Sequence, residues 1–330
     1  MNQSIVITHH ELIMDVISKR RQDTSIPLTN ISILDIFTHL KTWGYEGKNR
    51  LYGKNRFCGL LPLIKINPQQ NRIDLLFCIS DIEADNQIVR DFVHVNQVRD
   101  LARNNTEGVD TNVHILIKYN PQTPRNAQFA IEHRTGMGSK TFVDTLNYFL
   151  RHAVSSYSNN FQGNHPTERT SSGQPTKIPF KVKFKYQNII SDEVIRAFET
   201  GRVQDVLFHE AIPANNNFDP MGNYTQNKKT VHLNVGANVV SVNSTTIKDK
   251  VSDIKNSFTN IVKTHPNLRG TTFTIKFRNN NGHEQTAYYD SNVQEFSLVK
   301  KTYVESKLRQ AAAITPKLNA KLCDRMFAHI

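Results

Sequence analysis

The sequence predicts an α+β protein of two domains, each formed by antiparallel β-hairpins packed against helices. Its 330 residues exceed the usual size of a single hydrophobic core. Apolar runs bounded by turn residues alternate with amphipathic helical patterns, whereas residues 156–177 are rich in Ser, Asn, Thr, Gly and Pro and follow neither pattern. We therefore expect an N-terminal α+β domain over 1–155, a flexible linker over 156–177 and a basic C-terminal α+β domain over 178–330.

The composition indicates an anionic partner. The formal net charge is +12 and the pI is about 9.5, and such an excess of cations favours association with nucleic acid or a membrane surface. Residues 1–155 carry 18 Lys and Arg against 15 Asp and Glu, whereas residues 156–330 carry 23 against 14. The C-terminal half is therefore expected to hold most of the positive charge. No apolar run approaches the roughly 18 residues of a membrane-spanning helix, so we expect no membrane partner.

Two helix-start signals occur near the N-terminus. Residues 8–11, Thr-His-His-Glu, have the spacing of a capping box, and the apolar residues that follow predict a first helix with both histidines exposed in its first turn. Residues 32–35 form a second start signal before a strongly apolar helix that we expect to end at Gly44.

The segment 41–57 concentrates cations, aromatic rings and glycines, and Gly-Lys-Asn-Arg occurs in it twice, at 47–50 and 53–56. Glycine lets the backbone approach a ligand, Lys and Arg neutralise phosphates, and aromatic rings stack on unpaired bases. We interpret the segment as nucleic-acid-binding. The alternative is a hairpin or loop whose rings cover a small core while its cations face solvent. The residues expected to bind are Lys41, Trp43, Lys48, Arg50, Tyr52, Lys54 and Arg56.

Residues 57–80 contain two apolar runs separated by a turn, which predicts a β-hairpin in which Pro62 marks an edge or a bulge. Several carboxylates accompany the second run, and divalent cations in nucleases require oxygen ligands. A polar helix entry explains the same residues, and we favour it and assign no metal ligand. The candidate carboxylates of the nuclease alternative are Asp74, Asp81, Glu83 and Asp85.

A mixed polar helix over 88–103 and a second hairpin, with strands over 112–120 and 126–133, are expected next. His114 and Glu132 lie in these strands. We interpret both as ordinary strand residues, because nothing near either in the sequence supplies the second half of a catalytic pair.

Residues 135–141, TGMGSKT, open a helix whose N-terminal amides and dipole could hold a phosphate, without the spacing of a Walker motif. The loop resembles the Gly-x-Gly-x-x-Thr loop of helix-hairpin-helix DNA-binding elements, which implies a phosphate held on backbone amides. Such elements also need a helix before the loop, whereas residues 126–133 favour a strand, which would make the glycines a tight strand-to-helix turn. The candidate phosphate-binding residues are Gly136, Gly138 and Lys140.

The C-terminal domain is expected to begin with a strand over 178–186, in which apolar residues alternate with Lys181, Lys183 and Lys185. Alternate strand residues are about 6.5 Å apart, comparable to the phosphate spacing of an extended single strand, so the lysine row could follow a nucleic-acid backbone. Protection of an exposed sheet edge explains the row equally well.

The rest of the chain predicts a helix over 191–201, strands near 203–212 and 229–236, a lysine-rich helix over 246–265, a hairpin over 271–290 and a helical C-terminal stretch. Together with the strand over 178–186, this order resembles a ferredoxin-like split βαβ arrangement. That scaffold is shared by many nucleic-acid binders, but a fold alone does not give a function.

We expect a sequence-nonspecific nucleic-acid-binding protein, for DNA or RNA, that contacts phosphates and has neither cofactor nor catalysis of its own. The alternatives are the nuclease above and a structural subunit that binds an acidic protein partner or forms a homo-oligomer. Three cysteines without zinc-site spacing and the absence of a signal-peptide pattern favour the cytoplasm. Abundant Asn, Lys and Ile are typical of AT-rich genomes, and we expect a component of a bacterial genome-defence or mobile-element system.

Overall fold

The fold was analysed in a computed structural model. The structure describes residues 3–330 except 21–30, 85–86, 91–97, 102–103, 105–106, 135, 212–227, 234, 236–238, 242, 266–271, 279–281, 291–294, 297–298 and 307–316. It forms two compact units: unit 1 is Met1–Gln187 with Thr302–Ile330, and unit 2 is Asn188–Lys301. These limits do not coincide with the predicted boundaries near 155 and 177. The strand expected to open the second domain is hydrogen-bonded into the sheet of the first.

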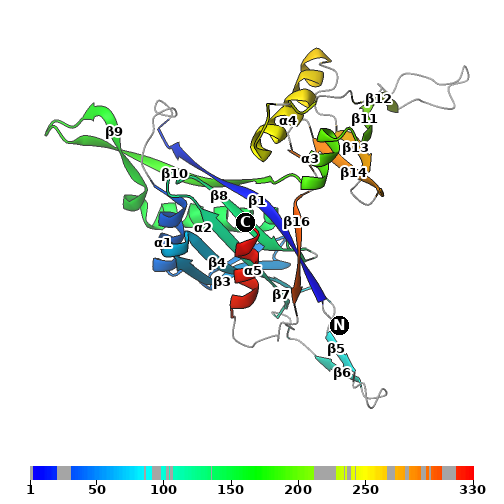
Figure 1. The fold of residues 1–330 in the computed structure, drawn as a ribbon. Helices are drawn as coiled ribbons and strands as arrows, with labels where there is room; N and C mark the ends of the chain where they lie inside the picture. The colour runs from blue at the N-terminus through cyan, green and yellow to red at the C-terminus, as the bar shows by residue number, and fades with distance from the viewer. Residues whose placement is uncertain are drawn as a thin grey trace, which may run out of the picture. The chain divides into compact units, whose positions relative to one another are not determined.

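Unit 1 is built on a curled antiparallel sheet of nine strands (Figure 1). Their order is β2-β3-β4-β7-β8-β1-β10-β9, and β16 pairs with β1 outside this path. The strands are β1 Gln3–Ser18, β2 Asn49–Tyr52, β3 Phe57–Asn67, β4 Arg72–Asp81, β7 Val109–Tyr119, β8 Asn126–Glu132, β9 Gln162–Arg169, β10 Pro175–Asn188 and β16 Lys301–Ser306. The candidate binding residues lie on both faces of this sheet.

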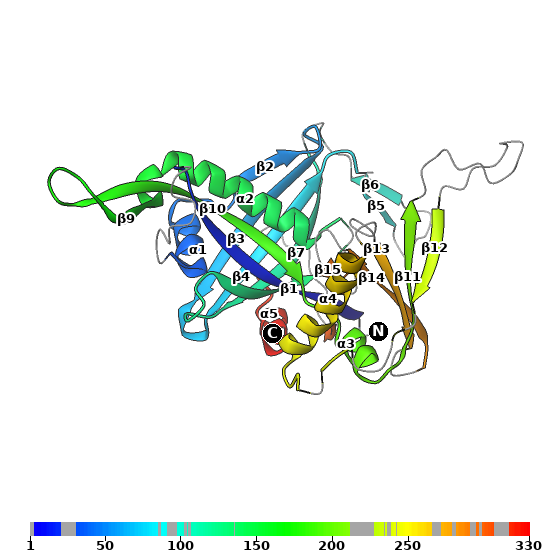
Figure 2. The same ribbon diagram turned by 90° about the horizontal axis from the view of Figure 1, so that it is seen from above.

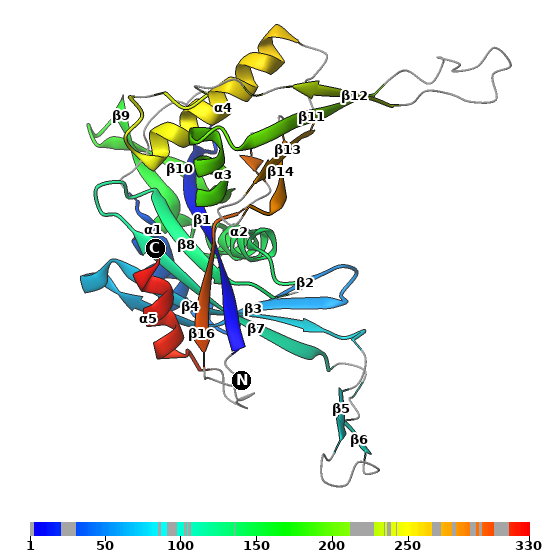
Figure 3. The same cartoon turned by 45° about the vertical axis from the view of Figure 1, so that its right-hand side comes forward.

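Three helices cover the two faces of this sheet. One face packs against α1 (Ile33–Thr42) and α2 (Ser139–Ser156), where Phe37 and Phe142 lie in the main core. The other face carries α5 (Ala320–Ala328), whose Leu322 and Met326 form a smaller cluster with Ile7. Figures 2 and 3 show α5 on the opposite side of the sheet from α2. None of the described helices is both long and apolar enough to cross a membrane.

The helix predicted after residue 8 is wrong, because residues 3–18 form strand β1. Leu12 packs in the core under α1 and α2, whereas Ile7 packs on the α5 side. A strand buried on both faces does not show the polar alternation of a half-exposed strand, so its apolar residues can also satisfy a helical period. His9 and His10, expected at an exposed helix start, are only 2% and 3% exposed.

The predicted linker over 156–177 is also wrong. Its residues complete α2, form a short 3-10 helix (η3, Ser158–Phe161) and then build the hairpin of β9 and β10, which projects from the sheet in Figure 2. The Ser-, Thr- and Gly-rich run 170–174 makes the turn, where Gly173 has a φ of 77°. A composition typical of linkers therefore also suits the tip of a long hairpin.

The polar helix predicted over 88–103 is replaced, where the chain is described, by two short strands. β5 (Gln87–Arg90) and β6 (Val98–Leu101) pair antiparallel as a separate two-stranded sheet. Strand pairing forms hydrogen bonds between backbone groups and needs no continuous apolar stripe. The mixed composition of this segment therefore does not distinguish a helix from a pair of strands.

The hairpins predicted over 57–80 and 112–133 and the helix after Ser32 are confirmed. Ser32 caps α1 in a capping box with Asp35. Pro62 lies where the β3–β4 register shifts between Leu60 and Leu63, which confirms the expected bulge.

Unit 2 has a five-stranded antiparallel sheet in the order β12-β11-β13-β14-β15, with α3 (Asp192–Glu199) and α4 (Ile247–Thr264). Its strands are β11 Val203–Ala211, β12 Lys228–Leu233, β13 Thr272–Arg278, β14 Glu284–Asp290 and β15 Glu295–Phe296. β12 and β13 both run antiparallel to the intervening β11, so α4 connects two strands of the same direction. The first strand of the ferredoxin-like expectation is β10 of unit 1, and residues 301–306, expected to be helical, form β16.

Candidate nucleic-acid interface

The net charge is concentrated in unit 1. Its residues include 28 Lys and Arg against 18 Asp and Glu, for a net charge of +10, whereas unit 2 has 13 against 11, for +2. The C-terminal half of the sequence was expected to hold most of the positive charge. When the charge is counted by folded unit, most of it belongs to unit 1. The cations of β9, β10 and the last 29 residues, 302–330, belong to the same unit as the basic-aromatic segment.

The two Gly-Lys-Asn-Arg copies of that segment adopt different conformations. In the first copy, Gly47 has a φ of 76° and the chain then enters β2. In the second, Gly53, Lys54 and Asn55 all have positive φ, at 60°, 57° and 69°, and form the turn between β2 and β3. An added Cβ at Gly53 would lie 2.9 Å from the Phe57 ring. The repeat therefore makes one irregular hairpin and does not present the same loop twice.

Trp43 has protein rings on both faces. Its ring centroid lies 4.6 Å from that of His39 and 4.3 Å from that of Tyr157, with interplanar angles of 3° and 6°. A base could stack on Trp43 only by displacing one of these rings. This geometry matches the alternative in which the rings of the segment serve the core.

Tyr45 and Tyr52 are also committed to packing. Tyr45 is 3% exposed and lies 5.8 Å from the Phe149 ring, and Tyr52 stacks on Phe57 at 5.3 Å. Burial raises the pKa of both tyrosine hydroxyls, so both are neutral at pH 7.

Two of the predicted cations are held by the protein itself. Arg56 donates from Nε and Nη2 to the Asp81 carboxylate at 3.0 and 2.9 Å, and its Nη1 lies 3.0 Å from Glu83. Its hydrogen bonds hold the pKa of Asp81 below the ordinary value. Lys41 donates from Nζ to the Ile64 carbonyl at 2.9 Å. Lys54 is exposed at the hairpin turn.

Arginines gather around Tyr148 where β2 packs on α2. The Arg50 guanidinium lies 5.2 Å from the Tyr52 ring and 5.8 Å from the Tyr148 ring, and the Arg151 guanidinium lies 6.0 Å from Tyr148. Arg50 also donates from Nη1 to Thr145 Oγ1 at 3.5 Å. Stacking on the rings keeps the two guanidinium groups at the surface and limits the rotamers they must lose on binding a ligand.

A polar cavity of about 230 Å³ lies beside this cluster. It exceeds the roughly 30 Å³ share of one liquid water many times over and can admit a phosphate group. Lys48 lies at its wall with Nζ 4.3 Å from the Tyr45 ring, and His152 packs edge-on against Tyr148 at 4.5 Å. The lining residues are Tyr45, Lys48, Asn49, Tyr148, Phe149, His152 and Ser156.

The exposed side of α2 extends this cationic surface. Lys140, Tyr148, Arg151 and His152 follow one another at helical spacing, and Asp144 in the same row pairs with Lys140 at 2.8 Å. Sequence reasoning missed Tyr148, Arg151 and His152. The signal was available, because these residues lie opposite the apolar stripe that predicted the helix. We call Lys48, Arg50, Lys140, Arg151 and His152 the α2 surface.

The glycine loop before α2 is a strand-to-helix turn. Gly136 has a φ of 79° and Gly138 is the N-cap of α2, with no side-chain cap. The preceding element is β8, so the resemblance to helix-hairpin-helix elements fails for lack of their first helix. The loop still joins the α2 surface through Lys140, whose pKa is raised chiefly by its hydrogen bond to Asp144 and slightly lowered by the charge of Arg50.

The lysine row of β10 lies on the other face of the sheet. Phe180, Val182 and their apolar neighbours are buried in the core under α1 and α2, so the alternating lysines point to the opposite side. Lys185 pairs with Asp15 at 2.6 Å, and Lys181 and Lys183 are exposed. The two predicted binding surfaces therefore cannot form one continuous site. The recorded pairing of β10 with β9 ends at Pro179, before the lysine row begins, so protection of a sheet edge stays an alternative for the row.

The carboxylates of the nuclease alternative do not converge where they are described. Asp74 is 4% exposed and accepts from Arg72 Nε at 2.6 Å, whereas Asp81, seven residues along the same strand, pairs with Arg56. Seven strand residues correspond to about 23 Å. Glu83 also contacts Arg56, and Asp85 lies outside the described residues. The described part of the chain contains no cluster of metal-ligating side chains.

His114 and Glu132, interpreted from the sequence as ordinary strand residues, are paired with each other. His114 Nδ1 lies 3.1 Å from the Glu132 carboxylate, and Arg134 donates to the same carboxylate at 2.8 and 2.9 Å. His114 Nε2 accepts from the Asn319 backbone amide at 3.0 Å. Both side chains are about 2% exposed. The network anchors the segment before α5 and is closed to a substrate.

A scan against protein-family models, a search of curated proteins and a search of solved structures each found no match to this chain.

Proposed function

We propose that unit 1 is a sequence-nonspecific nucleic-acid-binding unit that contacts phosphates through the α2 surface. The observation that carries the proposal is that Arg50 and Arg151 gather around Tyr148, a residue that lines a polar cavity together with Lys48. Guanidinium groups match phosphate geometry with paired donors, and a lysine adds a mobile point charge. The charge of +10 in unit 1 supports the same partner class.

The proposed contacts are to the backbone of the nucleic acid. The rings expected to stack on bases are packed against other rings of the protein, as the Trp43 sandwich illustrates. A surface dominated by cations, beside a Trp43 ring already stacked on protein rings, is suited to phosphates of DNA or RNA in either single or double strands. Base sequence should therefore have little effect on affinity.

The proposal includes no catalysis and no cofactor. Binding by charge alone fits a component of a bacterial genome-defence or mobile-element system in a reducing cytoplasm, where the three cysteines, which are free thiols, would persist. An acidic protein partner is the competing occupant of the α2 surface, because carboxylates are also bound by clustered arginines. Binding of purified nucleic acid to the protein distinguishes the two candidate partners.

The test uses two variants that each remove two positive charges, from opposite faces of the sheet. Lys48→Ala/Arg151→Ala alters the α2 surface, and Lys181→Ala/Lys183→Ala is the matched control. Affinities for duplex DNA, single-stranded DNA and RNA are measured by fluorescence anisotropy at one salt concentration. We expect the first variant to lose about tenfold or more on all three substrates. The control variant should bind nearly as the parent does.

Three outcomes would reject this assignment. If the β10 variant loses affinity and the α2 variant does not, the lysine row is the binding face. Equal losses would mean that net charge matters and no particular surface does. A parent protein that binds none of the three substrates, but co-purifies with an acidic protein, would favour the structural-subunit alternative.

A further inference from the structure

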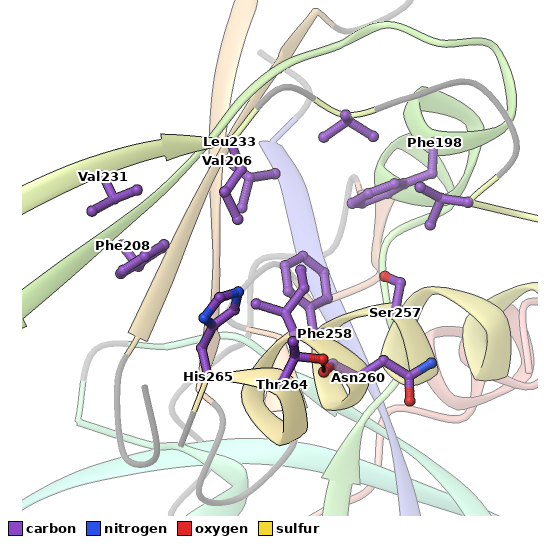
Figure 4. A pocket seen from close by; sticks show the side chains of 13 residues that line it. Phe198, Val206, Phe208, Val231, Leu233, Ser257, Phe258, Asn260, Thr264 and His265 are labelled. Carbon is purple, nitrogen blue, oxygen red and sulfur yellow. Dashed lines mark hydrogen bonds between the residues drawn. The ribbon is translucent and has the colours of Figure 1, made fainter. Parts of the chain in front are cut away.

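Unit 2 contains a cavity of about 630 Å³ between α4 and its sheet (Figure 4). Small-molecule sites commonly occupy roughly 300–1,000 Å³. Among the described residues that line this cavity, none is an Asp, Glu, Lys or Arg. Its chemistry therefore differs entirely from that of the α2 surface, and the nucleic-acid proposal leaves it unused.

The cavity exists because α4 packs toward one side of the sheet. Phe258 of α4 lies 5.2 Å from the Phe273 ring on β13 and 4.7 Å from the Tyr289 ring on β14. β12 is the edge strand on the far side of β11, and its Val231 and Leu233 remain only half-buried. Apolar side chains of the edge strand thus face a space that the helix does not fill.

The sheet side of the cavity is a compact apolar wall. Val206 lies directly opposite Leu233, and Phe208 lies opposite Val231, in the β11–β12 register. All four side chains line the cavity, and Phe198 of α3 lines it as well (Figure 4). Such a wall favours the burial of an aliphatic or aromatic body by roughly 25 cal/mol for each Å² removed from water.

All polar groups of the lining come from the last turns of α4 and its C-cap, His265. The hydroxyls of Ser257 and Thr264 already donate to backbone carbonyls of the helix at 2.7 and 2.9 Å, so toward a ligand they can only accept. The His265 ring stands beside the cavity in Figure 4. The final carbonyls of a helix carry the negative end of its dipole, which favours hydrogen-bond donors and disfavours anions.

We propose that this cavity binds an uncharged, mostly apolar small molecule with a hydroxyl or amide N–H group at one end. The apolar body lies against the β11–β12 wall, and the donor group lies at the C-terminal end of α4 beside His265. A carboxylate in the donor's place would lose its hydration without gaining a Lys or Arg partner among the described lining residues.

The first test compares two ligands of equal chain length on the full chain. The neutral dye Nile red is bound first, and decanol or decanoate is then titrated as a competitor at neutral pH. We expect saturable dye binding at a single site and displacement by decanol at concentrations about tenfold or more below those of decanoate. Decanoate competing equally well or better would overturn the neutral-ligand assignment, and the absence of saturable dye binding would overturn the site.

The second test fills the cavity from its edge strand. Val231→Trp and Leu233→Trp each place a large ring where the ligand body would lie, and both positions are half-buried, so repacking is tolerable. Tyr288→Ala is the control, because Tyr288 is 47% exposed and its neighbour Tyr289 faces the core of unit 2. With folding verified by circular dichroism, we expect either Trp variant to reduce dye affinity at least about tenfold. Retained affinity in both folded Trp variants, or an equal loss in Tyr288→Ala, would place the dye elsewhere.

Discussion

Trp43 shows how one side chain decides between base stacking and structural packing. An indole in a cationic segment can stack on a base or pack inside the protein. Each face of the indole has room for one ring, so an indole stacked on protein rings on both faces cannot also stack on a base. His39 precedes Trp43 by one helical turn of α1, and Tyr157 follows α2. The indole therefore joins the ends of the two helices that cover the sheet.

Replacing Trp43 should change stability and leave nucleic-acid affinity unchanged. We expect Trp43→Ala to lower the free energy of unfolding by about 3 kcal/mol, because it removes a ring packed on both faces. Urea unfolding measures this loss, and Trp43→Phe, which keeps a ring, should restore most of it. A Trp43→Ala variant as stable as the parent but weaker on single strands would show instead that the indole stacks on bases.

Glu132 provides a residue-scale prediction of pH dependence. Burial raises the pKa of its carboxyl, but the hydrogen bond from His114 and the charge of Arg134 outweigh burial, so the pKa lies below its ordinary value of 4.5. A folded pKa below the unfolded one adds stability that is fully present above the unfolded pKa and is lost as the pH falls through the folded pKa.

We therefore expect Glu132→Gln to destabilise the protein by about 1–3 kcal/mol at pH 7. The difference from the parent should shrink as the pH falls from 4.5 through the lowered pKa of the folded carboxyl, where the folded parent also becomes protonated. Denaturant unfolding at a series of pH values measures both effects. A difference that stays constant across the acidic range would mean that the carboxylate charge does not stabilise the fold.

At the scale of elements, the sequence correctly predicts that β10 is a strand but assigns it to the wrong unit. Its buried and exposed residues alternate as its sequence predicts, with Phe184 1% exposed and Lys183 exposed. The alternation specifies a strand with one buried face, and it contains no information about which sheet supplies the neighbours.

The alternation predicts opposite effects at adjacent positions of β10. Phe184→Ala should cost about 3–5 kcal/mol because it leaves a cavity beneath α1 and α2, whereas Lys183→Ala should change stability by less than about 0.5 kcal/mol. Thermal and urea unfolding of the two variants compare them directly. A destabilised Lys183→Ala would show that the lysine side is covered by protein, and would remove its value as a binding control.

Caps, turns and hydrophobic patterns, which depend on neighbouring residues, identify most helices and strands. The wrong predictions concern elements whose partners lie far along the chain. Capping at Ser32 and Thr246 and the turn at 68–71 specify their elements through neighbours in the sequence. The two faces of β1 are buried by α1 and α2 on one side and by α5 on the other, and its paired strands β8 and β10 lie far along the chain, so no local signal distinguishes it from a helix. For the same reason, Lys48 and Arg151 form one candidate surface only in three dimensions, although Lys48, Arg50 and Lys140 were each predicted separately.

At the scale of the whole molecule, the two units divide the chemistry. Unit 1 carries +10 of the net charge and the clustered arginines, and unit 2 carries +2 and a cavity whose described lining residues are mostly apolar. Electrostatic attraction acts over about 10 Å at moderate salt, so it depends on where charges gather and not only on their sum. For this reason we propose phosphate binding for unit 1.

The salt dependence of nucleic-acid binding tests this central claim most directly. Four or five phosphate contacts by the α2 surface should release counterions so that log affinity for duplex DNA falls with log salt at a slope of about −3.6 to −4.5. Lys48→Ala/Arg151→Ala should reduce the magnitude of the slope by about two, and Lys181→Ala/Lys183→Ala should leave it unchanged. A parent slope near zero, or a slope that only the β10 variant reduces, would contradict phosphate binding at the α2 surface.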